Sequence, residues 1–294
     1  MSNLWKRNRN WLTPLFFIVP GIVLFGTIII ASSIESVWIS FFDWDGVGPK
    51  TWVGLANYKE LLADPQFYVS LKNNIIWLVM FMAAPPLGLA LALLVNQKLG
   101  AMRFMKSLFF IPLVLATVTV GVVFGWVYDP NYGILALIFN AFGATAPALL
   151  SDEHFVTFAV VIAALWPQIA FCMVLFLAGL NNLSPDLIGA GQVDGARGFN
   201  MLWHVVLPQL RQVGFIALAV TVVGALRSFD MIAVMTSGGP FGSSEVLAYQ
   251  MFEQSIFSYR FGYGAAIATV LFVIMIAFIT WYLRIMVRME RETR

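Results

Sequence analysis

Long stretches without a charged residue constrain this chain more than any other feature. A helix that spans a membrane needs about 20 apolar residues to cross roughly 30 Å of hydrocarbon. Charge-free runs of at least that length lie at 11–34, 73–97, 107–128, 155–185 and 261–283, and a sixth apolar stretch, 212–236, is interrupted only by Arg227 and Asp230. The pattern predicts an all-α membrane protein with six transmembrane helices.

The composition agrees with a lipid environment. The chain is 60% hydrophobic and only 11% charged, which is too little polar surface for a soluble protein of this size. The basic residues Lys6, Arg7 and Arg9 precede an apolar run that is too long for a cleavable signal peptide, so it is expected to be an uncleaved anchor. Cys172 is the single cysteine and is interpreted as a packing residue.

The distribution of lysine and arginine predicts the orientation. With the N-terminus inside, twelve of the seventeen basic residues fall on the inner side. Both termini are therefore expected in the cytoplasm. The predicted organisation is a cytoplasmic N-terminus (1–10), a transmembrane permease domain (11–286) and a cytoplasmic tail (287–294). Its helices are expected over about 11–34, 70–97, 105–128, 155–181, 210–236 and 261–286.

Three features within the expected helices have more than one interpretation. Pro85 and Pro86 should bend or break the second helix, either as a packing kink or beside a pathway. Gly121 and Gly125 have the spacing that lets another helix approach closely. Arg227 and Asp230 are one turn apart and can pair; they either face a pathway, or form a structural ion pair or snorkel to the outer interface.

The sequence lacks the residue patterns of catalysis and nucleotide binding. No phosphate-binding loop is present, so ATP is not expected to bind this chain. His154 and His204 fall on opposite sides of the membrane in this topology, so no metal or catalytic site is expected. Nothing in the charge pattern indicates nucleic acid. A self-contained secondary carrier or channel remains an alternative, although no internal repeat supports it.

A polar, glycine-containing segment at 184–209 separates two apolar stretches on the expected cytoplasmic side. Ser184 and Pro185 can start a short helix that ends near Asp194, and Gly195 breaks it. A second helix, Gly198 to Leu207, is predicted to end before Pro208. These residues fit either a helix–turn–helix elbow or an ordinary loop on the membrane surface.

This segment resembles the cytoplasmic EAA loop of bacterial ABC importer permeases, whose pattern is roughly E-A-A-x-x-D-G-A, a spacer and L-P. The sequence matches at Ala190, Asp194, Gly195, Ala196, Leu207 and Pro208, and departs at Gly189, Gly191 and Leu202. Further motifs along the chain are similar to the carbohydrate-uptake branch that contains the maltose and glycerol-3-phosphate permeases. They are SFFDWDG, VGLANYKELLADPQF, SLFFIP, DPNYG, FDMIAVMTSGGP and FGYGAA.

The resemblance implies a type I ABC importer permease in the inner (cytoplasmic) membrane of a bacterium or archaeon. The expected partners are a second homologous permease, an extracytoplasmic solute-binding protein, and a homodimer or heterodimer of ATPase subunits that holds ATP and magnesium. The residues expected to dock on the ATPase are Gly189, Ala190, Asp194, Gly195, Ala196, Leu207 and Pro208. The residues expected to contact a sugar-type or glycerol-phosphate-type substrate are Thr117, Trp166, Gln168, Thr221, Ala225 and Ser228.

Overall fold

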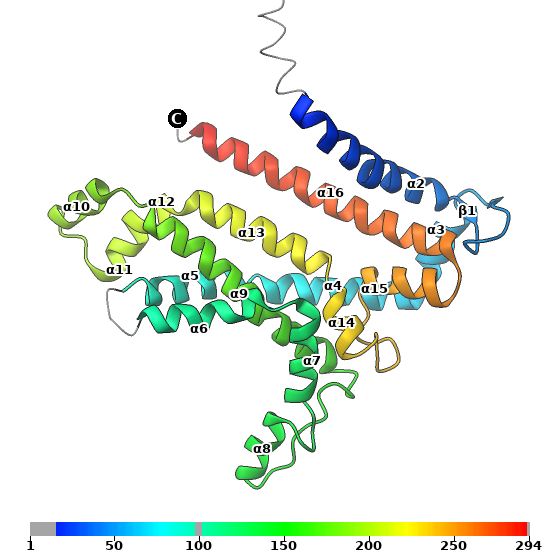
Figure 1. Ribbon diagram of the computed structural model, residues 1–294, viewed down its shortest axis with the longest axis horizontal. Helices are drawn as coiled ribbons and strands as arrows, with labels where there is room; N and C mark the ends of the chain where they lie inside the picture. Colours follow the sequence, from blue (N-terminus) through cyan, green and yellow to red (C-terminus); the bar gives the residue numbers. More distant parts are fainter. Residues whose placement is uncertain (1–15, 98–101, 293–294) are drawn as a thin grey trace, which may run out of the picture. The chain divides into compact units, whose positions relative to one another are not determined.

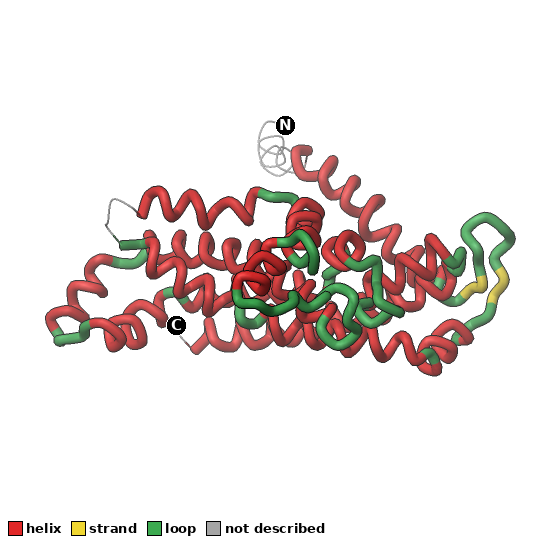
Figure 2. The backbone as a smooth tube through the Cα atoms, turned by 90° about the horizontal axis from the view of Figure 1, so that it is seen from below, coloured by secondary structure: helices red, strands yellow, loops and turns green. Residues whose placement is uncertain are grey.

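Helices make up nearly all of the ordered structure in the computed structural model, which describes residues 16–97 and 102–292 (Figure 2). The chain divides into two compact units. The first unit comprises Met1–Ala63 and Met251–Val270, and the second comprises Asp64–Gln250 and Leu271–Arg294. Each unit is described separately.

Four helices in the described ranges are long and apolar enough to cross a membrane: Phe16–Ile39, Pro65–Val95, Val156–Asn181 and Phe261–Arg288. Two further pairs of helices pass the same test jointly, although each pair is bent at a short break. If each bent pair is one span, six candidate spans result. This agrees with the predicted all-α membrane fold.

The first unit contains the helical stretch Phe16–Ile39, which includes a π-helical segment, η1 (Gly26–Ala31), and α2 (Ser32–Ile39). A short antiparallel hairpin follows, formed by β1 (Phe42–Asp43) and β2 (Thr51–Trp52), and then α3 (Ala56–Ala63). The Asn57 side-chain amide donates to the backbone carbonyls of Ser40 and Phe42. This buried amide therefore fixes α3 to the end of α2 and to the hairpin.

The second unit is built around the packing of α5 (Ala84–Val95) against α9 (Val156–Asn181), which lie side by side in Figure 1. Gly88 makes their close approach possible. A Cβ atom at Gly88 would lie 2.5 Å from Cys172 Cβ and 2.7 Å from the Met173 backbone nitrogen. Small residues at such contacts let membrane helices gain van der Waals contact where lipid removes most of the hydrophobic driving force.

The other helices of this unit surround that pair or connect it. Before α9 lie α4 (Pro65–Phe81), α6 (Met102–Val114), α7 (Thr117–Val127) and α8 (Ile134–Ala141). After α9 come α10 (Pro185–Val193), α11 (Gly198–Met201), η2 (Leu202–Val206), α12 (Leu207–Gln209), α13 (Arg211–Leu226) and α14 (Asp230–Met235). Three further elements complete the chain: α15 (Leu247–Phe252), η3 (Glu253–Phe257) and α16 (Phe261–Glu292). Of these, η3 belongs to the first unit, and α15 and α16 are each divided between the two units.

The helices differ from the predicted continuous rods in two places. The predicted helix 105–128 is α6 and α7, bent by 102° where Ala116 adopts an extended conformation. Pro112 lies in the last turn of α6 and removes a backbone donor there. The predicted helix 210–236 ends at Leu226, and α14 starts only at Asp230 because Phe229 leaves helical geometry.

The remaining predicted boundaries need smaller changes. The second helix starts at Pro65 and breaks at Met82–Ala83, directly before Pro85 and Pro86, as the two prolines predicted. Helix α16 continues to Glu292, so most of the expected tail 287–294 is helical. The expected N-terminus 1–10 and the start of the first helix lie outside the described residues.

Polar side chains anchor the segment 236–250 to α4 and α9 within the second unit. The Asn73 amide donates to the backbone carbonyls of Ser243 and Glu245. The Thr157 hydroxyl donates to the Ser243 carbonyl, and the Asn74 side-chain oxygen accepts from the Leu247 backbone nitrogen. The return from α14 to α15 is therefore held by hydrogen bonds to two helices.

We predict that Gly88→Ala lowers the thermal stability of the detergent-solubilised protein. The new methyl group would meet backbone atoms of α9, and overpacking of this kind costs about 1–3 kcal/mol. Gly125→Ala is the matched control because no atom lies within 4 Å of its Cβ position. Equal melting temperatures for the two variants would contradict the packing described here.

Candidate functional site

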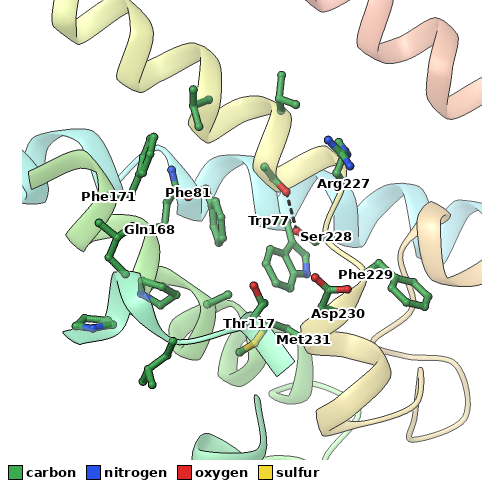
Figure 3. A pocket seen from close by; sticks show the side chains of 18 of the residues that line it. Trp77, Phe81, Thr117, Gln168, Phe171, Arg227, Ser228, Phe229, Asp230 and Met231 are labelled. Atoms are coloured by element: carbon green, nitrogen blue, oxygen red, sulfur yellow. Dashed lines mark hydrogen bonds between the residues drawn. The ribbon is translucent and has the colours of Figure 1, made fainter. Parts of the chain in front are cut away.

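A cavity of about 650 Å³ lies in the second unit between α4, α6, α7, α9 and the segment 219–231 (Figure 3). Its walls are mainly apolar, with Phe81, Phe171 and Met231 among them. Polar groups come from Thr117, Gln168 and Ser228. Apolar walls with a few polar groups are typical of a site for a small molecule.

Three of the helix breaks of the second unit border this cavity. Phe81 ends α4, Leu115 lies in the bend between α6 and α7, and 227–229 separate α13 from α14. All of these residues line the cavity, as does Pro167 inside α9. Non-helical backbone at membrane depth is tolerated only where protein buries it or where it lines a hydrated space. The position of these breaks therefore makes the cavity a candidate functional site.

Hydrogen bonds fix the orientation of the polar side chains in the wall. Gln168 Nε2 donates to the Thr221 hydroxyl at 2.9 Å, which connects α9 to α13. The Ser228 hydroxyl donates to the Ala225 carbonyl at 2.9 Å. The Gln168 side-chain oxygen has no such bond to any described residue, so it is available to accept from a ligand.

The six predicted substrate residues divide into two groups. Thr117, Gln168 and Ser228 line the cavity. Trp166, Thr221 and Ala225 lie outside the lining. Trp166 packs edge-on against Phe124, whereas Thr221 and Ala225 are fully buried. Thr221 therefore contributes to the cavity indirectly, because its hydroxyl accepts the hydrogen bond that orients the Gln168 side chain.

The predicted ion pair between Arg227 and Asp230 is not formed. Both residues line the cavity, but neither makes an ion pair with any described residue. Their spacing would place them on one face of a continuous helix. Because α13 ends at Leu226 and α14 starts at Asp230, that geometry is lost. In Figure 3 the Arg227 guanidinium is directed away from Asp230.

Trp77 lines the cavity, although it was not among the residues predicted from the sequence. It is only 1% exposed, and its indole nitrogen has no hydrogen-bond partner among the described residues. Ser70, Asn73, Asn74 and Trp77 follow helical spacing on α4, and all four are buried. This helical spacing of buried residues was visible in the sequence, but nothing in the apolar run marked Trp77 as a cavity residue.

The predicted elbow is present, and a specific turn forms it. After α10, the Gly195 N–H bonds to the Gln192 carbonyl and the Ala196 N–H bonds to the Gly191 carbonyl. Gly195 has a φ of +83°. This combination is a Schellman motif, which ends a helix with a left-handed residue that is usually glycine. The Asp194-Gly195-Ala196 match is thus a helix stop.

Several large apolar side chains of the elbow are exposed. Phe199 is 71% exposed and Val193 is 88% exposed. Phe199 also stacks on Trp203, with ring centroids 5.9 Å apart. Exposed apolar side chains of this kind indicate a surface that contacts another protein or the membrane.

Two glycines, Gly189 and Gly191, distinguish this elbow from the family pattern, and the space around them differs. A Cβ at Gly191 would lie 2.9 Å from Val205 Cγ2, so glycine there allows α10 to pack closely on η2. A Cβ at Gly189 would meet nothing within 4 Å. The position of the usual glutamate is therefore open, and a longer side chain fits there.

The predicted stop before Pro208 is wrong, because helical structure continues to Gln209. The preceding segment, η2, is π-helical, and the Leu207 N–H bonds back to the Leu202 carbonyl. The wider π turn accommodates the proline ring. The chain bends by 73° one residue later, between Gln209 and Arg211.

Comparisons with known proteins give consistent matches along the chain. Residues 86–294 match the family described as "Binding-protein-dependent transport system inner membrane component". A probable ABC transporter permease of Pyrococcus horikoshii is 32% identical over 92% of this chain and 94% of its own length. The sn-glycerol-3-phosphate transport system permease of Brucella abortus is 29% identical over 94% of each chain.

A solved structure shows the same fold. It belongs to a bacterial ABC transporter involved in the import of the acidic polysaccharide alginate. The TM-score is 0.85 at 19% sequence identity, and the match covers 98% of this chain and 99% of that one.

We predict that the cavity is reached by water at Thr117 but not at Ala225. The single native cysteine permits a test: Cys172→Ser is combined with Thr117→Cys or with Ala225→Cys. A charged methanethiosulfonate reagent should modify the exposed Thr117→Cys on the order of tenfold faster or more, because thiol reactivity requires access. Similar modification rates would refute the assigned cavity wall.

Proposed function

The chain belongs to the family of binding-protein-dependent transport system inner membrane components, and we propose that it forms half of the translocation pathway of an ABC importer. It is accordingly a multi-pass transport subunit of the inner membrane. We propose a sugar, an oligosaccharide or a glycerol-phosphate-type compound as its solute. A second, homologous permease would supply the other half of the pathway.

The observation that carries the proposal is the combination of the cavity with the elbow. The cavity offers hydrogen-bonding groups from α7, from α9 and from the segment 227–229 within apolar walls. Such a lining suits a solute with many hydroxyl groups, because amides and hydroxyls can both donate and accept. The elbow offers an exposed apolar surface for a second protein. A solute site and a docking surface in one chain suit a transport subunit powered by another subunit.

The proposed role of the elbow is to dock on an ATPase subunit. Val193, Phe199 and Trp203 would supply the apolar contact. Gly189, Ala190, Asp194, Gly195, Ala196, Leu207 and Pro208 would define the shape of the elbow. ATP and magnesium would bind to the ATPase partner, and ATP hydrolysis would occur there rather than in this chain. An extracytoplasmic binding protein would deliver the solute.

The relatives support a hydroxyl-rich solute. The Brucella relative is named for the transport of sn-glycerol 3-phosphate, and the solved transporter imports a polysaccharide. Both compounds carry several oxygen atoms that can accept hydrogen bonds from the polar groups of the cavity wall. The transported compound would be found by screening the cognate binding protein against sugars and polyol phosphates and then measuring uptake into proteoliposomes.

Gly195→Pro is predicted to abolish solute-stimulated ATP hydrolysis in the reconstituted transporter while the chain still inserts into the membrane. Proline fixes φ near −65°, whereas Gly195 requires +83°. The Schellman turn cannot form, so the elbow loses its shape. ATP hydrolysis with and without the solute-loaded binding protein, measured in proteoliposomes, gives the readout.

Gly195→Ala provides a graded comparison. A left-handed alanine costs about 1–2 kcal/mol, so coupling should be weakened rather than lost. Membrane insertion and assembly with the second permease are measured in parallel. Normal coupled activity of Gly195→Pro would rule out the proposed role of the elbow.

A further inference from the structure

The N-terminus of α10 is capped by a residue from the far end of the elbow. Ser184 precedes the helix in an extended conformation, and its hydroxyl makes no capping bond. Its backbone N–H donates to Gln209 Oε1 at 3.3 Å. In a capping box that N–H is satisfied by a glutamate or glutamine at the third helical position, which is Leu187 here. Gln209 therefore completes the cap from a distance of 25 residues along the chain.

The side-chain amide of Gln209 is held at both of its ends. Its oxygen accepts from the Ser184 N–H, and Nε2 donates to the Val205 carbonyl at 3.0 Å in the preceding helical segment. These two bonds fix the direction of a half-buried side chain. Ser184 is the first residue of the elbow and Gln209 is the last, so the bond between them closes the elbow at its base.

The closed base of the elbow rests on α9. Leu210, the next residue, is 2% exposed and belongs to the same buried cluster as Leu180 of α9. A Cβ atom at Gly179 would lie 2.8 Å from Leu210 Cδ2 and 3.0 Å from Val213 Cγ2. Glycine at this position therefore lets the start of α13 pack directly on the last turn of α9, beside α12 in Figure 1.

Helices α9 and α13 are joined a second time at the cavity, where Gln168 donates to Thr221 at 2.9 Å. Gln168 lies eleven residues before Gly179, about 16 Å along α9. Thr221 lies eleven residues after Leu210, a similar length of α13. The two helices are thus tied together both at the base of the elbow and at the cavity wall, and they connect one to the other.

We propose that Gln209 is a positioning residue that couples movement of the elbow to the cavity. Its bond to Ser184 makes the start of α10 and the start of α13 move together, so that α9 and α13 shift as one part and carry Gln168 with them. Without this bond, α10 can move while Leu210 keeps its place on α9. The inference rests on the proposed function, because it requires that an ATPase subunit moves the elbow.

Three variants separate this role from a general contribution to folding. Gln209→Met keeps the approximate size of the side chain and removes the acceptor. Gln209→Asn keeps the amide but is one methylene shorter, so it does not reach the Ser184 N–H. Gln209→Glu keeps acceptor oxygens at the same reach. Ser184→Ala is the matched control, because its backbone N–H remains and the lost hydroxyl makes no capping bond.

The test uses the complete transporter, with both permeases, the ATPase and the binding protein, in proteoliposomes. Thr117→Cys in the Cys172→Ser background reports on the cavity wall. The rate at which a charged methanethiosulfonate reagent modifies this cysteine is measured without nucleotide and with ATP plus vanadate, which traps the ATPase in its closed state. ATP hydrolysis and the melting temperature are measured for every variant.

With Gln209 in place, ATP plus vanadate should change the modification rate severalfold. Gln209→Met and Gln209→Asn should reduce that change by roughly two- to tenfold, the size expected for one neutral hydrogen bond. Both variants should still hydrolyse ATP and melt near the wild-type temperature. Gln209→Glu and Ser184→Ala should respond as the wild type does.

A full response by Gln209→Met or Gln209→Asn would overturn the proposal, as would loss of the response in Gln209→Glu. A loss that is matched by a fall in melting temperature would also overturn it, because Gln209 would then only stabilise the fold. If Gln209→Met does not assemble, Gln209→Asn decides the outcome.

The wild type tests the proposed function separately. If its modification rate does not depend on nucleotide, the elbow does not drive the cavity and the proposed transport role fails. If the wild type responds and the Gln209→Met and Gln209→Asn variants respond equally, the role of Gln209 fails and the transport role stands.

Discussion

Inside a membrane, backbone polar groups need hydrogen-bond partners. This rule governs the cavity region of the second unit. Continuous helices satisfy that rule internally, and a break in a helix does not. In the second unit the breaks after Phe81, around Leu115 and at 227–229 all border one cavity. Three of the unit's breaks therefore lie at one place, where a hydrated space can satisfy the freed backbone groups. The proposed binding of a solute depends on this arrangement of helix breaks around the cavity.

The fold was largely predictable because hydrocarbon imposes a simple length and polarity requirement. The charge-free runs located the candidate spans, and Gly195 located the elbow turn. The break between α6 and α7 was not predicted, because its extended residue is an alanine with no conformational signature. The break after Leu226 was also missed, since Arg227-Ser228-Phe229 contains neither glycine nor proline.

The site was only partly predictable because it lies at helix breaks that the sequence does not reveal. The possible pair of Arg227 with Asp230 assumed a continuous helix, and it is not formed because α13 ends before Arg227 and α14 starts at Asp230. Thr221 was predicted as a substrate contact, whereas it lies behind the wall and orients Gln168. The sequence identifies polar residues within apolar runs. Which of them reach a cavity depends on local bends of the backbone that only the structure provides.

The Schellman turn at Gly195 would have a mechanical role if the elbow docks on an ATPase subunit as proposed. Two hydrogen bonds close the turn, and Gly191 allows α10 to pack tightly on η2, so α10 is held against the following helical segment at two places. A rigid part transmits both displacement and rotation, whereas a loose loop would absorb them. The direction in which α11 leaves α10 is therefore set by two left-handed glycines, Gly195 and Gly198.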